Sequence, residues 1–350
     1  MGQTPPVGGG ATPVGALLDA IATGCAPRFL RSGDSRTVRP VERNDPTARE
    51  IAREVAKAAG VTADVVLFPS GSLPVFAAGP DAVVKLYPTP WEHECDLERA
   101  ALEACAGRLP IPTPKPLHAE RRDGCTALVM TRLRGVSLVD PWRTMTREER
   151  VAIARAVGEA LAALHTIPVD APGLARPDWV AFERGQRAAC ATTQRTRGLD
   201  ERWAAQVDSF LAATPTGDAR RALLHTEVMP EHLLVERRGA GWALTGLLDF
   251  EPSIVGAPEY EFASIGAFLT GGEGATLRAM LLAYGLSPRD LDPALARRLL
   301  AWTLLHRYSN LARYLAMRPP GPGVTTLDAL AARWFAFADE PELRSASTQK

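Results

Sequence analysis

The residues most able to do chemistry lie on either side of one predicted hairpin. Glu227 and His232 precede a short apolar run, and Asp249 follows a second apolar run. The segment 237–241 between the runs has the arginine and glycine composition of a turn, which predicts an antiparallel hairpin. The hairpin brings His232 beside Asp249 and leaves Glu227 on the loop before them. A carboxylate and a second ligand at one hairpin mouth can share a divalent cation, an arrangement typical of phosphoryl transfer.

The spacing of these residues resembles the signature of a known family. The loop reads His225-x-Glu227-x-x-x-x-His232, and Asp249 follows the hairpin. The pattern is similar to the His-x-Asp-x-x-x-x-Asn loop and metal-binding Asp of the aminoglycoside phosphotransferases, although the loop's Asp and Asn are both replaced here. A strand with a lysine, a helix with a glutamate and a helix ending in Leu-His recur in the family's order. The resemblance covers about residues 44 to 340 and is closest to the hygromycin B phosphotransferases.

Glu227 stands where the resemblance places the catalytic base. In a loose phosphoryl-transfer transition state the acceptor hydroxyl needs orientation more than a strong base, so a longer carboxylate can serve. The extra methylene moves the carboxylate oxygens by about 1 Å, and a misplacement of that size costs on the order of a hundredfold in rate. The loop backbone must therefore compensate. The alternative is a pseudokinase that has lost its base.

Asp249 and His232 are the predicted metal ligands, and the resemblance implies Mg²⁺ or Mn²⁺. Asp249 ends an apolar strand and keeps the family's residue type. His232 replaces an amide oxygen with an imidazole nitrogen, which suits transition metals better than magnesium. His232 therefore either ligates a softer ion or has left the metal shell, and we favour hydrogen bonding or phosphate contact. We expect His225 to brace the loop and Glu261 to support it.

Lys85 is the predicted phosphate-binding residue for ATP or GTP. It lies in an apolar strand-like run, where an ammonium group needs a counter-charge. Glu98 on the following helix is the natural partner, although Glu94 shares a similar face, and the resemblance assigns the pair of Lys85 and Glu98 to the nucleotide phosphates. The alternative is an edge-strand lysine that reaches solvent.

Two further nucleotide contacts are implied by the resemblance. Ser70, Gly71 and Ser72 occupy the position of the family's nucleotide-covering turn, whose backbone N–H groups approach the phosphates, although an ordinary hairpin turn explains the same residues. Met130 is expected to offer backbone groups to adenine.

The elements that must position these residues fall into two unlike parts. Five strand signals and one main helix in residues 44–130 predict a small antiparallel lobe. Residues 131–135 look like a connector, and helical periodicity with the hairpin set into it fills 136–340. The predicted fold class is α+β, a bilobal protein-kinase-like fold with an antiparallel-sheet N-lobe and a mostly helical C-lobe. Residues 1–43 and 341–350 are expected to be disordered or loosely packed.

Three helix starts carry capping signals. Asp45 and Pro46 read as an N-cap followed by proline at the first helical position, in a helix that Gly60 stops. The segment 89–92, Thr-Pro-Trp-Glu, combines an N-cap, a first-position proline and a capping-box glutamate. The segment 146–149 is a second capping box.

Bulk composition excludes several classes of protein. The 350 residues are 46% hydrophobic with a formal net charge of zero, so no global field recruits nucleic acid or an anionic membrane. Five scattered cysteines favour a reduced environment. We find no signal peptide and no window of membrane-spanning length. The expectation is a cytoplasmic protein, monomeric or weakly dimeric.

Acidic residues outnumber basic ones between positions 227 and 261. This segment fits a divalent metal and a polycationic substrate, because acidic clefts concentrate cations, although a solvated acidic surface is the alternative. The seven acids, set against only Arg237 and Arg238, are Glu227, Glu231, Glu236, Asp249, Glu251, Glu259 and Glu261.

The leading hypothesis is an ATP-dependent O-phosphotransferase that acts on an aminoglycoside-type antibiotic such as hygromycin B, and hence confers antibiotic resistance. One alternative is a pseudokinase that binds nucleotide, and another is a kinase of a different small metabolite such as choline, homoserine or a sugar. A metal hydrolase built on His225, Glu227 and His232 is a weaker hypothesis, since the chain has neither an HExxH motif nor any cysteine after Cys190.

Overall fold

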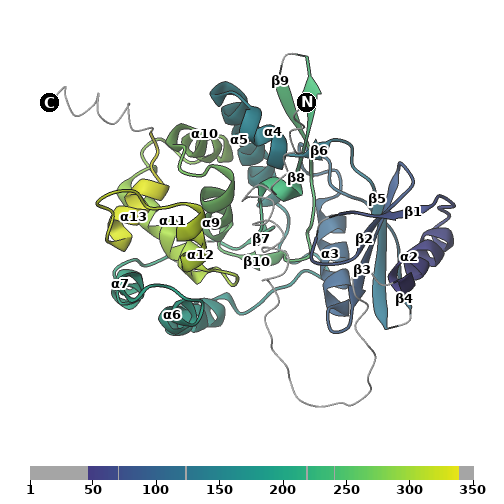
Figure 1. Cartoon of the computed structure of the whole chain (residues 1–350), viewed down its shortest axis with the longest axis horizontal. Helices are drawn as coiled ribbons and strands as arrows, with labels where there is room; N and C mark the ends of the chain where they lie inside the picture. Colours follow the sequence, from purple (N-terminus) through teal and green to yellow (C-terminus); the bar gives the residue numbers. More distant parts are fainter. Residues whose placement is uncertain (1–45, 70, 123, 218–219, 240, 339–350) are drawn as a thin grey trace, which may run out of the picture. The chain divides into compact units, whose positions relative to one another are not determined.

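The computed structural model of the protein describes residues 46–338 except 70, 123, 218–219 and 240 (Figure 1). The described chain divides into two compact units. The first comprises residues 46–92 and 117–132, and the second comprises residues 93–116 and 133–338. The N-cap predicted at Asp45 and the segments 1–43 and 341–350 lie outside the described residues.

The first unit is built on a five-stranded sheet with the order β1-β2-β3-β5-β4, in which β1–β2, β2–β3 and β3–β5 pair antiparallel. Five strands were predicted here, and five are found. Their bounds are β1 Val65–Leu67, β2 Val75–Ala78, β3 Ala82–Pro88, β4 Pro116–Arg122 and β5 Cys125–Thr131.

Helix α2 (Pro46–Ala58) covers this sheet through one apolar stripe. Its buried residues, among them Ile51 and Val55, recur at helical spacing and join a core with Phe76 and Val84 of the sheet. The helix ends as predicted, because Gly60 takes the left-handed conformation that favours glycine.

Helix α3 (Glu92–Cys105) begins two residues later than the capping signal predicts. The N–H of Trp91 donates to the Pro88 carbonyl at 2.6 Å, so a turn occupies the residues expected to start the helix. The Thr89 hydroxyl lies 2.7 Å from the Glu92 carboxylate and 2.9 Å from the Gly124 carbonyl. The hydroxyl therefore links the turn to the β4–β5 connection and does not cap the helix.

The second unit is mostly helical. Helix α5 (Arg147–Leu164) begins at Thr146 with the predicted capping box, and the reciprocal bonds with Glu149 are both present. It packs on α10 (Gly274–Tyr284) so closely that a Cβ at Gly158 would lie 2.2 Å from the Met280 carbonyl oxygen. The remaining α-helices are α4 Val139–Thr144, α6 Trp179–Thr196, α7 Glu201–Ala204, α8 Val207–Ala212, α9 Phe262–Ser264, α11 Pro293–Leu305, α12 Leu311–Met317 and α13 Leu327–Trp334.

Two small sheets inside the second unit carry the residues of chemical interest. Strands β8 (Leu233–Arg238) and β9 (Gly241–Leu247) form the predicted antiparallel hairpin, and β6 (Val136–Ser137) adds a third strand. Strands β7 (Ala222–Leu224) and β10 (Ile254–Gly256) pair antiparallel in a second sheet. The α+β class predicted from the sequence is confirmed. Among the described residues, no helix has the length and apolar character needed to cross a membrane.

Candidate active site

The loop that follows β7 is fixed by a buried carboxylate. The backbone N–H groups of His225 and Thr226 donate to Glu261 at 2.6 and 2.8 Å, and Glu261 is fully buried. Thr226 has a φ of 73°, a left-handed conformation that is costly for a β-branched residue. The predicted supporting role of Glu261 is therefore confirmed, and its two bonds help to hold the strained turn.

His225 braces the same loop from within. Its Nε2–H donates to the Leu248 carbonyl at 2.7 Å, and its Nδ1 accepts the N–H of Glu227 at 3.3 Å. Both bonds require the neutral ring protonated on Nε2. Burial lowers the pKa of His225 to about 4, against the opposing effect of Glu261, so the neutral form persists at neutral pH. The predicted bracing role is confirmed.

Glu227 follows this turn and is partly buried. Burial raises the pKa of Glu227, the imidazole of His232 opposes the shift, and Asp249 adds to it. A raised pKa suits a carboxylate that has to accept a proton near neutral pH.

His232 lies between the two acids on the 3₁₀ turn η1 (Pro230–His232). Its Nδ1–H donates to the Glu227 carbonyl at 2.7 Å, and its Nε2 lies 3.2 Å from Asp249 Oδ2. Burial alone lowers the pKa of His232, but the carboxylates of Asp249 and Glu227 outweigh it and raise that pKa. The structure thus brings Glu227, His232 and Asp249 together, as the hairpin predicted.

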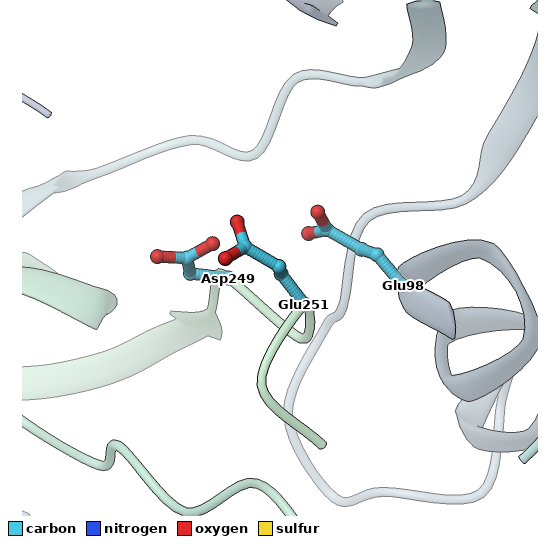
Figure 2. A group of neighbouring side chains, drawn as sticks. All are labelled: Glu98, Asp249 and Glu251. Atoms are coloured by element: carbon cyan, nitrogen blue, oxygen red, sulfur yellow. The ribbon is translucent and has the colours of Figure 1, made fainter. Parts of the chain in front are cut away.

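Asp249 opens a turn that gathers three carboxylates. Figure 2 shows Asp249 and Glu251 on this turn, with Glu98 approaching from helix α3. One carboxylate oxygen of each residue lies within 4.8 Å of the others. Glu98 is only 1% exposed, and its Oε1 accepts the N–H of Phe250 at 3.2 Å. Three hard oxygen donors at this spacing fit Mg²⁺ or Mn²⁺.

Glu98 and Glu251 join Asp249 in this carboxylate cluster, and neither of them was predicted there from the sequence. Glu98 was predicted as the partner of Lys85, and Glu251 was counted only among the acids of its segment. The sequence spacing could have predicted Glu251, because an acid two residues after Asp249 lies on the same turn. The approach of Glu98, by contrast, depends on how α3 packs, and no local pattern reports that.

Lys85 lies in β3, which is a central strand between β2 and β5. Its residue is 6% exposed, and its ammonium nitrogen lies 5.3 Å from the centre of the Tyr87 ring. The alternative of an edge-strand lysine that reaches solvent is therefore wrong. The pairing of Lys85 with Glu98 stays a prediction.

The other predicted nucleotide contacts also stay predictions. Gly71 has a φ of +125° and is exposed, as is Ser72, whereas Ser70 lies outside the described residues. Met130 is buried in β5 opposite Val83.

Part of the acidic excess between 227 and 261 is internally balanced. Glu259 forms an ion pair with Arg298 on α11 at 3.0 Å, and Glu261 accepts the loop N–H groups described above. The argument for a polycationic substrate therefore applies to fewer acids than the sequence count suggested, chiefly those around Glu227 and Asp249.

An α+β fold with a carboxylate cluster beside a buried loop agrees with a phosphotransferase. Residues 64–302 match the model of the phosphotransferase enzyme family known as APH, and the chain belongs to that family.

Solved structures similar to this chain include three antibiotic phosphotransferases. The GDP complex of wild-type aminoglycoside 2'-phosphotransferase-IIIa has 19% identity and a TM-score of 0.61, over 73% of this chain and 87% of that one. The macrolide 2'-phosphotransferase MphH from Brachybacterium faecium has 20% identity and a TM-score of 0.56, over 78% and 99%. The aminoglycoside-3'-phosphotransferase of type VIII has 18% identity and a TM-score of 0.52, over 75% and 99%. Likenesses at these identities show the fold.

Proposed function

We propose that the protein transfers the γ-phosphate of ATP or GTP to a hydroxyl group of a small cationic aminosugar, as in aminoglycoside antibiotics. The observation that carries this proposal is the convergence of Glu98, Asp249 and Glu251 next to a loop that presents Glu227. Structurally similar proteins were solved with GDP and kanamycin, and with ATP and streptomycin. Use of a nucleoside triphosphate also agrees with the expected cytoplasmic location.

Asp249, Glu98 and Glu251 would hold Mg²⁺ or Mn²⁺, since their oxygens are the donors these ions prefer. When bound, the ion supplies neutralisation of the phosphate charge and orientation of the triphosphate. Lys85 is proposed to bind the phosphates, the turn at Ser70, Gly71 and Ser72 to cover them, and the backbone at Met130 to contact adenine. These three roles rest on the family membership.

Glu227 is proposed to orient the acceptor hydroxyl and to take its proton on a carboxylate oxygen. Its raised pKa, which burial causes, favours that transfer near neutral pH. The backbone bonds at its N–H and C=O groups hold the residue in one place, which supports the backbone compensation that a longer carboxylate requires.

His232 is proposed to act as a hydrogen-bond donor to Asp249. Its Nδ1 already donates to the Glu227 carbonyl, so a bond from Nε2 to Asp249 needs a second proton on the ring. The raised pKa of His232 favours that doubly protonated form. A metal ligand would instead use the neutral ring with the same Nδ1 bond, a pattern common among histidine ligands.

The acceptor is proposed to be an aminoglycoside such as hygromycin B or kanamycin. Removal of phosphate from ATP and from GTP is measured with each of these, with a macrolide, and with choline and homoserine, at several concentrations of Mg²⁺ and Mn²⁺. The expected result is turnover that depends on one antibiotic, with a product heavier by one phosphate group.

Two other outcomes bear on the alternatives. Turnover with choline or homoserine alone would reassign the acceptor while keeping the reaction. Tight nucleotide binding without turnover on any acceptor would contradict the proposal and favour a pseudokinase.

A further inference from the structure

The segment that leaves helix α11 contacts the Glu227 loop at the Thr226 carbonyl, whereas Glu261 binds the N–H groups of His225 and Thr226. His306 ends this helix and is buried. Its Nε2 lies 3.2 Å from the carbonyl oxygen of Thr226. Because a carbonyl only accepts, Nε2 must carry the proton. The Nδ1 of the same ring accepts the N–H of Tyr308 at 3.3 Å, which requires the same tautomer.

His306 is held as a neutral donor with a fixed direction. The ring of Tyr260 stacks on it with 4.7 Å between centroids and 26° between planes. Burial lowers the pKa of His306 to about 3, and the neighbouring Arg307 acts in the same direction. The ring therefore stays neutral through the physiological range.

Arg307 connects the same segment to Tyr260 and Pro252. Its backbone N–H donates to the Tyr260 hydroxyl at 2.9 Å, and its guanidinium donates to the carbonyl of Pro252. That carbonyl also accepts the hydroxyl proton of Thr226 at 3.2 Å. The residues after α11 therefore reach Thr226 twice, directly through His306 and indirectly through Pro252.

The Thr226–Glu227 peptide group is consequently bonded at both ends. Its C=O accepts from His306, and its N–H donates to His225. A peptide group is planar, so holding both its ends restricts the orientation of the whole plane, and with it ψ of Thr226 and φ of Glu227. Those dihedrals set the direction in which the Glu227 side chain leaves the backbone.

We propose that His306 is a positioning residue for phosphoryl transfer, which sets the direction of the Glu227 carboxylate through its hydrogen bond to the Thr226 carbonyl. This inference rests on the proposed role of Glu227. Nothing in it requires His306 to touch substrate or nucleotide.

The test compares two amides of different reach. In His306→Gln the amide nitrogen can lie close to the position of Nε2, whereas in His306→Asn the shorter side chain places its amide nitrogen near the position of Nδ1. Both variants bury a neutral amide. We expect His306→Asn to lower kcat about 10- to 100-fold with KM for the nucleotide unchanged. We expect His306→Gln to stay within about threefold of the parent.

A double-mutant cycle then asks whether the effect acts through Glu227. In a Glu227→Gln background, His306→Asn should lower kcat by less than about twofold, because there is no longer a base to direct. Thermal unfolding and nucleotide affinity are measured for all variants, so that a folding defect is seen directly.

The outcomes separate this inference from the proposed function. If Glu227→Gln alone lowers kcat, but His306→Asn loses the same factor in both backgrounds, the positioning role is wrong and the proposed function stands. Equal kcat for the Asn and Gln variants of His306 also overturns the inference. If Glu227→Gln leaves kcat unchanged, the assignment of the base fails, and the inference fails with it.

Discussion

The loop after β7 and the turn after β9 lie side by side and are stabilised in opposite ways. In the loop, the N–H groups of His225, Thr226 and Glu227 all have acceptors within the protein. The turn instead brings the carboxylates of Asp249 and Glu251 up to that of Glu98. Like charges this close disfavour one another unless a cation joins them. The loop is therefore held by hydrogen bonds within the protein, whereas the carboxylates of the turn would be stabilised by a bound cation.

Removing the Asp249 carboxylate should have the largest effect. We expect Asp249→Asn to lower kcat/KM on the order of a thousandfold. The substitution removes a proposed ligand of the ion that offsets negative charge in the transition state. Thermal unfolding of the metal-free variant is measured beside the parent, because the substitution removes both the repulsion within the cluster and the contact of Asp249 with His232. Glu236→Gln on β8 is the matched control, as it removes an acid outside the cluster. Parent-like turnover by Asp249→Asn would end the metal assignment.

Shortening the base tests whether the loop is set for a glutamate. We expect Glu227→Asp, although it restores the residue type of the family, to lower kcat on the order of a hundredfold, because the carboxylate falls about 1 Å short. Steady-state kinetics on both substrates provide the measurement. Improved turnover by this variant would mean that the backbone does not compensate for the longer side chain.

Glu251→Gln should weaken the cation site without abolishing it. We expect the Kd for Mn²⁺, measured by calorimetry, to rise about 10- to 100-fold. The stabilisation of the parent by excess Mn²⁺ in thermal unfolding should shrink correspondingly, because an ion that binds only the folded state adds its binding free energy to stability. An unchanged Kd would remove Glu251 from the ligand set.

On the loop side of the comparison, Glu261→Gln should reduce stability. The carboxylate accepts two buried N–H groups, and an amide offers one oxygen and turns its NH₂ group toward the other donor. The expected cost is about 1 to 3 kcal/mol in urea unfolding, with no change in metal affinity. A loss of Mn²⁺ binding in this variant would show that the loop and the turn are not independent.

The last prediction concerns acid pH. His225 and His306 are buried as neutral rings with pKa values of about 4 and about 3, against an ordinary value of 6.5. The unfolded chain therefore binds more protons, and stability should fall as pH drops from 6.5 towards 4. In His306→Gln the loss measured by urea unfolding over this window should be smaller than in the parent. An identical pH dependence would mean that His306 is not buried in its neutral form.

Local patterns predicted the elements of this protein, and tertiary contacts explain what those patterns missed. The capping box at Thr146 and the β8–β9 hairpin follow from short-range chemistry, and both are present. The hairpin in turn brought His232 to Asp249. Glu98 joined the carboxylate cluster and His306 reached the loop only through the packing of α3 and α11, which no spacing along the chain encodes. The start of α3 was misplaced because a backbone turn took precedence over a plausible cap.

The absence of a side chain at Gly158 limits which substitutions this position can accept. Helices α5 and α10 meet there with no room for even a methyl group. In a saturation library, only glycine at position 158 should give folded protein, whereas exposed positions of the same two helices should accept many residues. Any second change that restores folding to Gly158→Ala is expected on α10 near Met280, because the added methyl group meets the backbone of that helix.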